Sequence, residues 1–354
     1  MSRFLSPRVH GEGPCLRRLA LPTPTCSGTL ARRAARRTIG QALLARSTIT
    51  AAMRAPDIGE GNQGLLDDLE RKRTRRRAHF VLGAILSTYI LLYARAASFA
   101  FVWDDLPAVI QNPLYAGSWS AGLAATQHDH LDLAQRRLGE ARPAHDSYRP
   151  ALYLSHRSER ALYGTSAAGH HIHNIVLGAL AIALVFMLAR TWLDDLTKAL
   201  AVTGVFALHP VQVEPLVYVS GRGDLLSAIF GIISLLTALR GANYAGQRMR
   251  RVPWLLASTS ALVLALLSKE AYIGLPAALL LIAWSQNRLR RHVADVCAHA
   301  IGLALYLALR LSMARVTGGH SGLDGALLLP GLWLQYLRIT LIPSDLSITR
   351  PFAT

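Results

Sequence analysis

Residues 71–94 have the sequence RKRTRRRAHFVLGAILSTYILLYA, in which six basic residues precede an apolar run without Asp, Glu, Lys or Arg. The run at 78–94 is close to the length of about 20 residues that crosses a bilayer as a helix, and Arg95 can extend it by snorkelling to the interface. A basic cluster next to such a run is typical of a cytoplasmic membrane anchor. By itself the cluster would also fit a solvated tail or a nucleic-acid-binding arm.

Apolar runs of the same kind recur along the rest of the chain. They cover residues 174–189, 199–213, 225–239, 252–268, 271–287, 296–309 and 325–337. Several are shorter than a bilayer-crossing helix, and a run of about 10–14 residues can equally belong to the core of a soluble protein. The residues at their ends, such as Arg190 and Arg310, matter for this reason, because they can lengthen a span by about a turn.

The distribution of Lys and Arg among the connecting loops provides an independent test of a membrane topology. If the cluster at 71–77 is cytoplasmic, the loops after even-numbered runs must also be cytoplasmic and should be rich in basic residues. They hold Arg190 and Lys198, then Arg240, Arg248, Arg250 and Arg251, then Arg288, Arg290 and Arg291. This parity predicts an all-α, polytopic membrane helix bundle of about eight spans with a cytoplasmic N-terminus, in a bacterial inner membrane or an ER-like membrane.

The N-terminal residues differ in composition from the rest. Residues 1–77 hold 16 basic and six acidic residues, which accounts for +10 of the formal net charge of +17. Two interpretations of residues 1–52 stay open: a transit peptide, or an upstream stretch translated from an early start codon, with Met53 as the true start. We therefore expect a basic, disordered leader at 1–76. A membrane domain at 77–354 then either ends at a bundle edge or is a truncated form of a longer protein.

Charge and cysteine content argue against two classes of protein. The positive charge lies in the leader and the inside loops instead of on a folded basic face, so we expect no nucleic-acid partner. The cysteines Cys15, Cys26 and Cys297 are too few and too scattered for a disulfide framework or a thiolate metal site.

The unusual polar residues fall in the loops predicted to face the external side. The first of these loops, about 102–172, is much the longest and begins with Trp103-Asp104-Asp105. Adjacent carboxylates beside an aromatic ring can have a raised pKa and act as a general base, or they can bind a divalent cation. Alternatively, Asp105 followed by Leu106 and Pro107 fits a helix N-cap.

The same loop ends with Tyr148-Arg149-Pro150 and a predicted amphipathic helix at 151–162. We expect this helix to lie in the membrane interface with Tyr153 as its anchor; the alternative is a soluble helix packed on the loop. The sequence HHIHN follows at 170–174. Because residues two apart do not share a helix face, interfacial histidines at a helix end are favoured over a metal site.

The other two external loops are short and rich in charge. The second contains His209, Pro210, Glu214, Pro215, Arg222 and Asp224, and the third contains Ser268-Lys269-Glu270. Backbone groups freed by two prolines are tolerated in a membrane only inside protein or beside a wet cavity. Arg222 either pairs with Asp224 or faces a lipid phosphate. Lys269 and Glu270 are either functional or a self-neutralising pair at a turn.

In their order and spacing these motifs resemble a known family. The residues are Trp103-Asp104-Asp105 with Asn112-Pro113, Tyr148-Arg149-Pro150, His209-Pro210 with Glu214, Gly221-Arg222 with Asp224, Ser268-Lys269-Glu270, and Pro276. Together they resemble the multi-spanning, lipid-dependent glycosyltransferases of the GT-C class, in particular the transmembrane O-mannosyltransferase branch that carries tetratricopeptide repeats. The resemblance runs from about residue 80 to Leu346 and does not include the repeats.

The resemblance implies an inverting transfer of a mannose-like hexose from a polyprenyl-phosphate donor to a hydroxyl acceptor, on a protein or a glycan, at the external face. It implies Asp104 or Asp105 as the catalytic base and Arg149, Arg222 and Lys269 as the cations at the donor phosphate. The remaining candidates, His209, Glu214, Asp224 and Glu270, would shape the pocket for sugar and acceptor. No cofactor is certain, and dependence on a divalent cation stays open. Because the repeats are missing, a protein acceptor is in doubt.

A non-catalytic membrane scaffold or a transporter is the competing interpretation. Transporters often contain inverted repeats and helices broken near the middle of the membrane. The chain has no convincing internal repeat, and its polar motifs gather at one predicted face of the membrane. This arrangement favours the enzyme.

Overall fold

The computed structural model describes the backbone of residues 60–112, 115, 117–120, 148–313 and 323–343. Every regular element within these ranges is helical. The chain divides into two compact units, Met1–Lys72 and Arg73–Thr354, and the second holds all of the helices except the start of the first. Most of the predicted leader, residues 1–59, lies outside the described residues.

The helices follow one another with short connections. In chain order they are α2 (Glu60–Tyr93), η1 (Ala94–Ser98), η2 (Asp105–Ile110), α5 (Pro150–Tyr163), α6 (Ala167–Trp192), α7 (Leu196–Leu208), η4 (Pro210–Gln212), α8 (Val213–Val217), η5 (Val219–Gly221), α9 (Arg222–Gly241), η6 (Ala242–Tyr244), α10 (Arg248–Ser268), η7 (Glu270–Gly274), α11 (Leu275–Ser285), α12 (Leu289–Met313) and α13 (Leu323–Leu341). Six of the eight predicted apolar runs each lie on one helix, whereas the runs at 199–213 and 271–287 are divided among shorter helices.

The structure supports a polytopic helix bundle, while the predicted count of about eight spans is not confirmed. Among the described residues, five helices are long and apolar enough to cross a membrane: Asp68–Ser98, Ala167–Trp192, Val219–Tyr244, Arg248–Ser268 and Leu289–Ser312. A bent pair, Leu196–Leu208 with Pro210–Val217, would add a sixth. Helix α11 has only 11 residues, which is short for a span.

Helix α9 lies at the centre of the second unit and packs on both α6 and α10. Small residues on α9, among them Gly231, Ser234, Ala238 and Gly241, are fully or nearly fully buried at these contacts. Such residues let the backbones of membrane helices approach closely, and close packing is what holds helices together where lipid is as apolar as the side chains.

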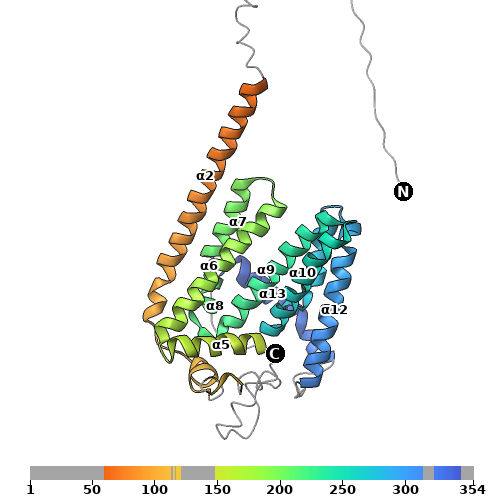
Figure 1. The fold of residues 1–354 in the computed structure, drawn as a ribbon. Helices are drawn as coiled ribbons and strands as arrows, with labels where there is room; N and C mark the ends of the chain where they lie inside the picture. The colour runs from red at the N-terminus through yellow and green to blue at the C-terminus, as the bar shows by residue number, and fades with distance from the viewer. Residues whose placement is uncertain (1–59, 113–114, 116, 121–147, 314–322, 344–354) are drawn as a thin grey trace, which may run out of the picture. The chain divides into compact units, whose positions relative to one another are not determined.

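The loop motifs and the arginine-rich loops lie at opposite ends of this bundle. Figure 1 shows α5 lying across one end, beside the beginning of α9, with the connection between α6 and α7 at the other end. Since α9 begins at the α5 end and is followed by η6, the α9–α10 connection also lies at the end away from α5. The parity of the arginines therefore corresponds to a real separation in space.

Two prolines break the chain between α7 and α9, as expected. Pro210 begins η4 and Pro215 lies within α8, and the α7 and η4–α8 segments meet at a bend of 51°. The amide of Asn174 donates to the carbonyl oxygens of Pro215 and Tyr218, each at 3.4 Å. The carbonyl groups freed by the break thus find a partner inside the protein, as a membrane requires.

Helix α5 forms at the predicted place, but its orientation differs from the expectation. Tyr153 is fully buried and packs on Tyr115, with 5.1 Å between ring centroids, so its predicted role as an interface anchor is wrong. The polar residues His156, Arg157 and Glu159 are buried too. The polar face of α5 is directed toward the bundle, because Arg222 and His170 lie there and contact Glu159.

Candidate functional site

The turn that carries Asp104 and Asp105 directs the two carboxylates to different environments. Trp103, just before them, has a left-handed backbone with φ of 49° and a half-exposed ring. A left-handed conformation is costly for a residue with a Cβ, by about 1–3 kcal/mol, and such strain is common at functional sites. The turn leaves Asp104 exposed and Asp105 fully buried.

Asp105 anchors the loop to the start of α9. Its carboxylate accepts hydrogen bonds from the backbone N–H of Ser220 at 2.8 Å and from that of Val102 at 3.3 Å. It lies inside the first turn of η2 and does not cap it, so the N-cap interpretation is wrong. Asp105 is therefore a structural link between two segments that are far apart in the sequence.

Asp104 keeps one carboxylate oxygen in contact with a phenol. The hydroxyl group of Tyr218 donates to Asp104 Oδ2 at 2.9 Å. Burial and this hydrogen bond raise the pKa of the Tyr218 phenol, so the ring remains a donor at neutral pH. Asp104 is thus an exposed carboxylate held in place by a neutral partner, which leaves its second oxygen available to a substrate.

Arg149 and Glu270 form a bidentate ion pair. Arg149 Nε and Nη2 donate to the two carboxylate oxygens of Glu270 at 3.0 and 2.7 Å. Burial alone would raise the pKa of Glu270, but the hydrogen bonds and charge of Arg149 outweigh it and lower the pKa to about 2. The planar guanidinium matches a carboxylate in this geometry, and it would match a phosphate equally well.

Lys269, the neighbour of Glu270 in the sequence, forms a second ion pair with Asp224. Lys269 Nζ lies 2.6 Å from Asp224 Oδ2, and the two side chains are 32% and 43% exposed. The turn at Ser268 approaches α9 closely at Gly223, where an added Cβ would lie 3.2 Å from the Ser268 carbonyl oxygen. Arg149, Glu270, Lys269 and Asp224 together form what we call the four-charge cluster.

Two pairings that the sequence left open as alternatives are therefore wrong. Arg222 does not pair with Asp224, and Lys269 does not pair with its neighbour Glu270. Each of these residues finds its partner across a helix contact, and this brings the loop before α5, the start of α9 and η7 together at one end of the bundle.

Arg222 is fully buried in a polar network beneath α5. It contacts the carboxylate of Glu159 closely, donates to Asn174 Oδ1 at 2.7 Å and lies 3.2 Å from His156 Nδ1. Glu159 in turn lies 2.8 Å from His170 Nδ1. With no exposed surface, Arg222 is not accessible to a phosphate in this arrangement.

Among the described residues, neither His209 nor Glu214 forms an ion pair with these groups. The ring of His209 accepts the backbone N–H of Val211 at 3.2 Å, which is a local cap on η4. Glu214 is exposed on α8, and among the described residues no cation lies within ion-pair distance of it. The same part of the chain contains no group of three or more His, Cys, Asp or Glu side chains placed to hold a metal ion.

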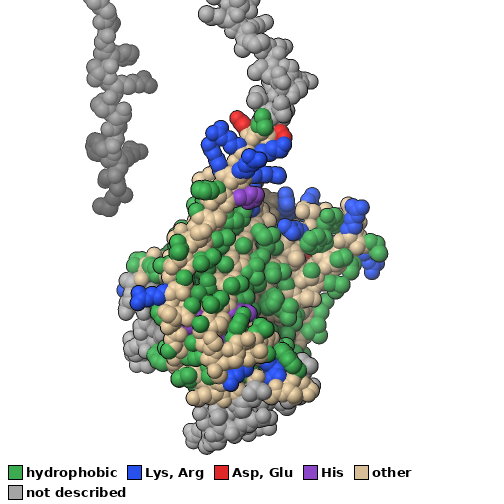
Figure 2. Space-filling view, turned by 60° about the vertical axis from the view of Figure 1, so that its left-hand side comes forward, with side chains coloured by type: hydrophobic (Ala, Val, Ile, Leu, Met, Phe, Trp, Pro, Cys, Tyr) green, Lys and Arg blue, Asp and Glu red, His purple; other side chains and the backbone are tan. Residues whose placement is uncertain are grey.

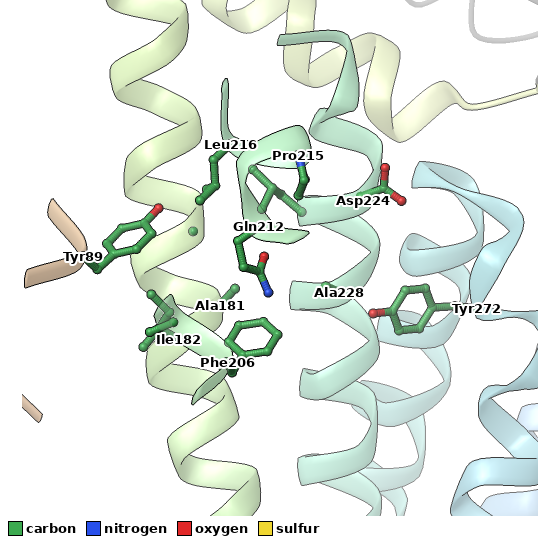
Figure 3. A pocket seen from close by; sticks show the side chains of 13 residues that line it. Tyr89, Ala181, Ile182, Phe206, Gln212, Pro215, Leu216, Asp224, Ala228 and Tyr272 are labelled. Atoms are coloured by element: carbon green, nitrogen blue, oxygen red, sulfur yellow. The ribbon is translucent and has the colours of Figure 1, made fainter. Parts of the chain in front are cut away.

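A cavity of about 210 Å³ lies between α2, α6, α7, α8, α9 and η7. Figure 3 shows Asp224 and Tyr272 on one side of it, Tyr89 on the other, and Gln212 and Phe206 between them. Most of its remaining lining is aliphatic. The cavity thus joins an apolar interior to one member of the four-charge cluster, Asp224.

Sequence reasoning did not assign a role to Glu159, Tyr218 or Asn174. Two features of the sequence pointed to this network: Glu159 lies within a helix assigned to the membrane interface, and Arg222 lies at the start of a membrane helix. A buried charge needs a partner, so that pairing could have been sought, although the sequence alone does not say which acid supplies it.

Comparison with known proteins finds protein O-mannosyl-transferases among the relatives of this chain. The chain is 32% identical over 151 residues to the protein O-mannosyl-transferase Tmtc1 of Drosophila melanogaster, covering 42% of this chain and 17% of that protein. It is 30% identical over 180 residues to Tmtc2 of the same fly, covering 50% and 18%. For TMTC2 of Homo sapiens the identity is 30% over 115 residues, covering 32% and 14%.

The chain resembles Tmtc-type protein O-mannosyl-transferases. The matched segments are about a fifth or less of the length of these Tmtc relatives. No protein-family model matches the chain, and no solved structure matches it.

Proposed function

We propose that this protein is a membrane glycosyltransferase that moves a mannose-like hexose from a polyprenyl-phosphate donor to a hydroxyl group, with inversion. The observation that carries the proposal is the placement of an exposed, oriented carboxylate, Asp104, at the same end of the bundle as the four-charge cluster. The names of the Tmtc relatives support mannose as the sugar and a protein as the acceptor.

Asp104 is the proposed general base. As the acceptor oxygen attacks the anomeric carbon, its proton passes to the free carboxylate oxygen of Asp104, and the bond from that carbon to the phosphate oxygen breaks. A base positioned in this way contributes about 10²- to 10⁴-fold to the rate. Attack from the face opposite the leaving phosphate inverts the configuration.

Arg149 and Lys269 are the proposed cations at the donor phosphate. The leaving polyprenyl phosphate gains negative charge in the transition state, and fixed cations stabilise that charge. Both side chains are partly exposed, and each is held by an acid that a phosphate could replace. Arg222 was expected in the same role, but its burial supports a structural role better, and His209 and Glu214 stay predictions for the sugar pocket.

The cavity is the proposed site for the first part of the lipid chain. Its wall is mainly aliphatic and aromatic, and Asp224 connects it to the four-charge cluster. Each buried CH₂ group of a lipid contributes about 0.8 kcal/mol. A donor anchored there would present its phosphate to Lys269 and Arg149.

The same proposal includes the topology. An N-terminus in the cytoplasm and a site on the external side would follow if the arginine-rich end of the bundle faces inward, as the positive-inside rule requires. The count of about eight spans stays a prediction. A leader at 1–76 and a membrane domain at 77–354 remain part of this proposal.

The test is transfer of radiolabel in membranes that contain the protein. With polyprenyl-phosphate [³H]mannose as the donor, we expect label in a protein fraction, and with a nucleotide-activated mannose, in membranes depleted of polyprenyl phosphate, we expect none. Arg149→Gln and Lys269→Gln should each lower the rate by about 10²-fold.

His79→Gln is a control, because His79 lies on α2 next to the predicted cytoplasmic cluster, away from the site. It should transfer label at the wild-type rate. Transfer from the nucleotide sugar alone, or full activity of both cation variants, would contradict the proposal.

A further inference from the structure

We propose that the α9–α10 and α11–α12 connections form one binding surface for the phosphate headgroups of anionic membrane lipids. The surface consists of six exposed arginines, and we refer to it as the arginine surface: Arg240, Arg248, Arg250, Arg288, Arg290 and Arg291. It lies at the end of the bundle away from the four-charge cluster, and it does not depend on the transferase proposal.

A buried set of polar contacts joins the α9–α10 and α11–α12 connections. Arg251 at the start of α10 donates to Asp295 Oδ2 at 2.9 Å and to the carbonyl oxygen of Arg291 at 2.6 Å. His292 Nδ1 lies 3.2 Å from the same carboxylate oxygen. Because Arg251 and Asp295 are buried, this contact fixes the first turns of α10 and α12 side by side. The exposed arginines are therefore held on a common scaffold.

The arginine surface has no exposed acid of its own. Between residues 240 and 295 the only acids are Glu270, at the opposite end of the bundle, and Asp295, which is buried against Arg251. The α6–α7 connection differs, because there Arg190 and Lys198 are accompanied by Asp194 and Asp195. An insertion signal alone requires only a surplus of basic residues, whereas a preorganised surface without counter-charges attracts an external anion.

The surroundings of the arginine surface favour a lipid over a soluble anion. Below the arginines, α10 exposes Val252 and Leu256 and α12 exposes Val293, as expected of helices that face hydrocarbon. Tyr244 and Trp254 stack at this level, with 6.4 Å between centroids and 7° between planes. Aromatic residues of this kind mark the headgroup region of a membrane. Figure 2 shows separate Lys and Arg side chains at the upper right of the bundle, above a mainly hydrophobic surface.

The chemistry of arginine suits the proposed ligand. Each guanidinium offers a fork of N–H donors that can bind a phosphate with two hydrogen bonds. Clusters of about four to eight basic residues next to membrane helices commonly bind anionic lipids, with each residue near the surface adding to the attraction. Six such groups above apolar helix ends meet this description.

The experiment measures lipid binding by the protein after it has been extracted from membranes and purified in a mild detergent. Dioleoylphosphatidylglycerol or dioleoylphosphatidylcholine is added, and the rise in unfolding temperature is followed with lipid concentration. We expect the anionic lipid to stabilise the protein at a concentration at least about tenfold lower than the zwitterionic lipid does, and 0.5 M NaCl to weaken this effect.

Matched variants locate the effect. R288Q/R290Q and R248Q/R250Q should each raise the phosphatidylglycerol concentration needed by about tenfold or more. R190Q/K198Q also removes two positive charges at this end of the bundle, and it should leave the required phosphatidylglycerol concentration unchanged. R288K/R290K keeps the charge, and it should raise the required phosphatidylglycerol concentration by only about two- to threefold.

Three outcomes would overturn the proposal. They are equal stabilisation by the two lipids, no effect of salt on the wild-type protein, and an equal loss in R190Q/K198Q and R288Q/R290Q. The last would mean that the arginines serve membrane insertion or general charge only. Because lipid selectivity and salt dependence are measured on the wild-type protein, misfolding of a variant does not decide the result.

Discussion

Glu159 and Arg222 are opposite charges without solvent contact, and in the described part of the chain Arg222 is the one Lys or Arg side chain within ion-pair distance of Glu159. They join α5 to the start of α9, and His170 and Asn174 add hydrogen bonds from α6. Because Arg149 directly precedes α5 and Asp105 binds the backbone just before Arg222, this buried pair positions both halves of the proposed site.

Removing one member of this pair should destabilise the protein strongly. Glu159→Gln and Arg222→Met each leave a buried charge uncompensated, and we expect a loss of about 3–5 kcal/mol in the free energy of unfolding. The double variant Glu159→Gln with Arg222→Met should lose less than the sum of the two single losses. Thermal unfolding in detergent provides the measurement, and additive losses would show that the two charges do not interact.

The Arg149–Glu270 pair makes a prediction about acid. The pKa of Glu270 lies at about 2 in the folded protein against an ordinary value of 4.5, so the pair stabilises the fold above about pH 4.5 and is lost as the pH falls toward 2. We expect the unfolding temperature of the wild type to exceed that of Glu270→Gln at pH 6 and to converge with it near pH 2. A difference that does not change with pH would contradict the ion pair.

The residue types at this site could be predicted from the sequence, but their pairings could not. Asp104, Arg149, Asp224, Lys269 and Glu270 all lie at one end of the bundle as expected. Their partners depend on which helices meet and at what height.

At the scale of elements, the apolar runs determined where helices form, and their lengths did not determine how many cross the membrane. The run at 271–287 becomes η7 and a short α11, because Lys269 and Glu270 bind partners on other elements and Pro276 lies in the first turn of a new helix. The polar face of α5 faces the bundle because Arg222 lies there, which the pattern of α5 alone does not reveal.

The contact between α9 and η7 depends on Gly231. A Cβ at this position would lie 2.4 Å from the ring of Tyr272, which also lines the cavity. Gly231→Ala should displace Tyr272 and raise the KM for the polyprenyl-phosphate donor severalfold, because the cavity loses part of its wall. Gly83→Ala on α2 is the control, since nothing lies within 4 Å of its added Cβ, and it should behave as wild type. An unchanged KM in Gly231→Ala would separate the cavity from donor binding.

At the scale of the molecule, the loops after even-numbered apolar runs are rich in arginine, and the polar sequence motifs lie at the other end of the bundle. In a background without Cys15, Cys26 and Cys297, a cysteine at Ser118 should react with a membrane-impermeant thiol reagent from outside, and one at Ala245 should react only after permeabilisation. The positive-inside rule is the physical reason. The reverse pattern would place the four-charge cluster in the cytoplasm and overturn the proposed topology.

The central claim is that Asp104 accepts the proton of the acceptor hydroxyl. The most direct test is the rate of [³H]mannose transfer from polyprenyl phosphate by Asp104→Asn, measured on protein whose unfolding temperature equals that of the wild type. We predict a rate lower by about 10²- to 10⁴-fold with donor binding retained, whereas Asp105→Asn should lower the unfolding temperature. Transfer by a stable Asp104→Asn protein at the wild-type rate would contradict this assignment.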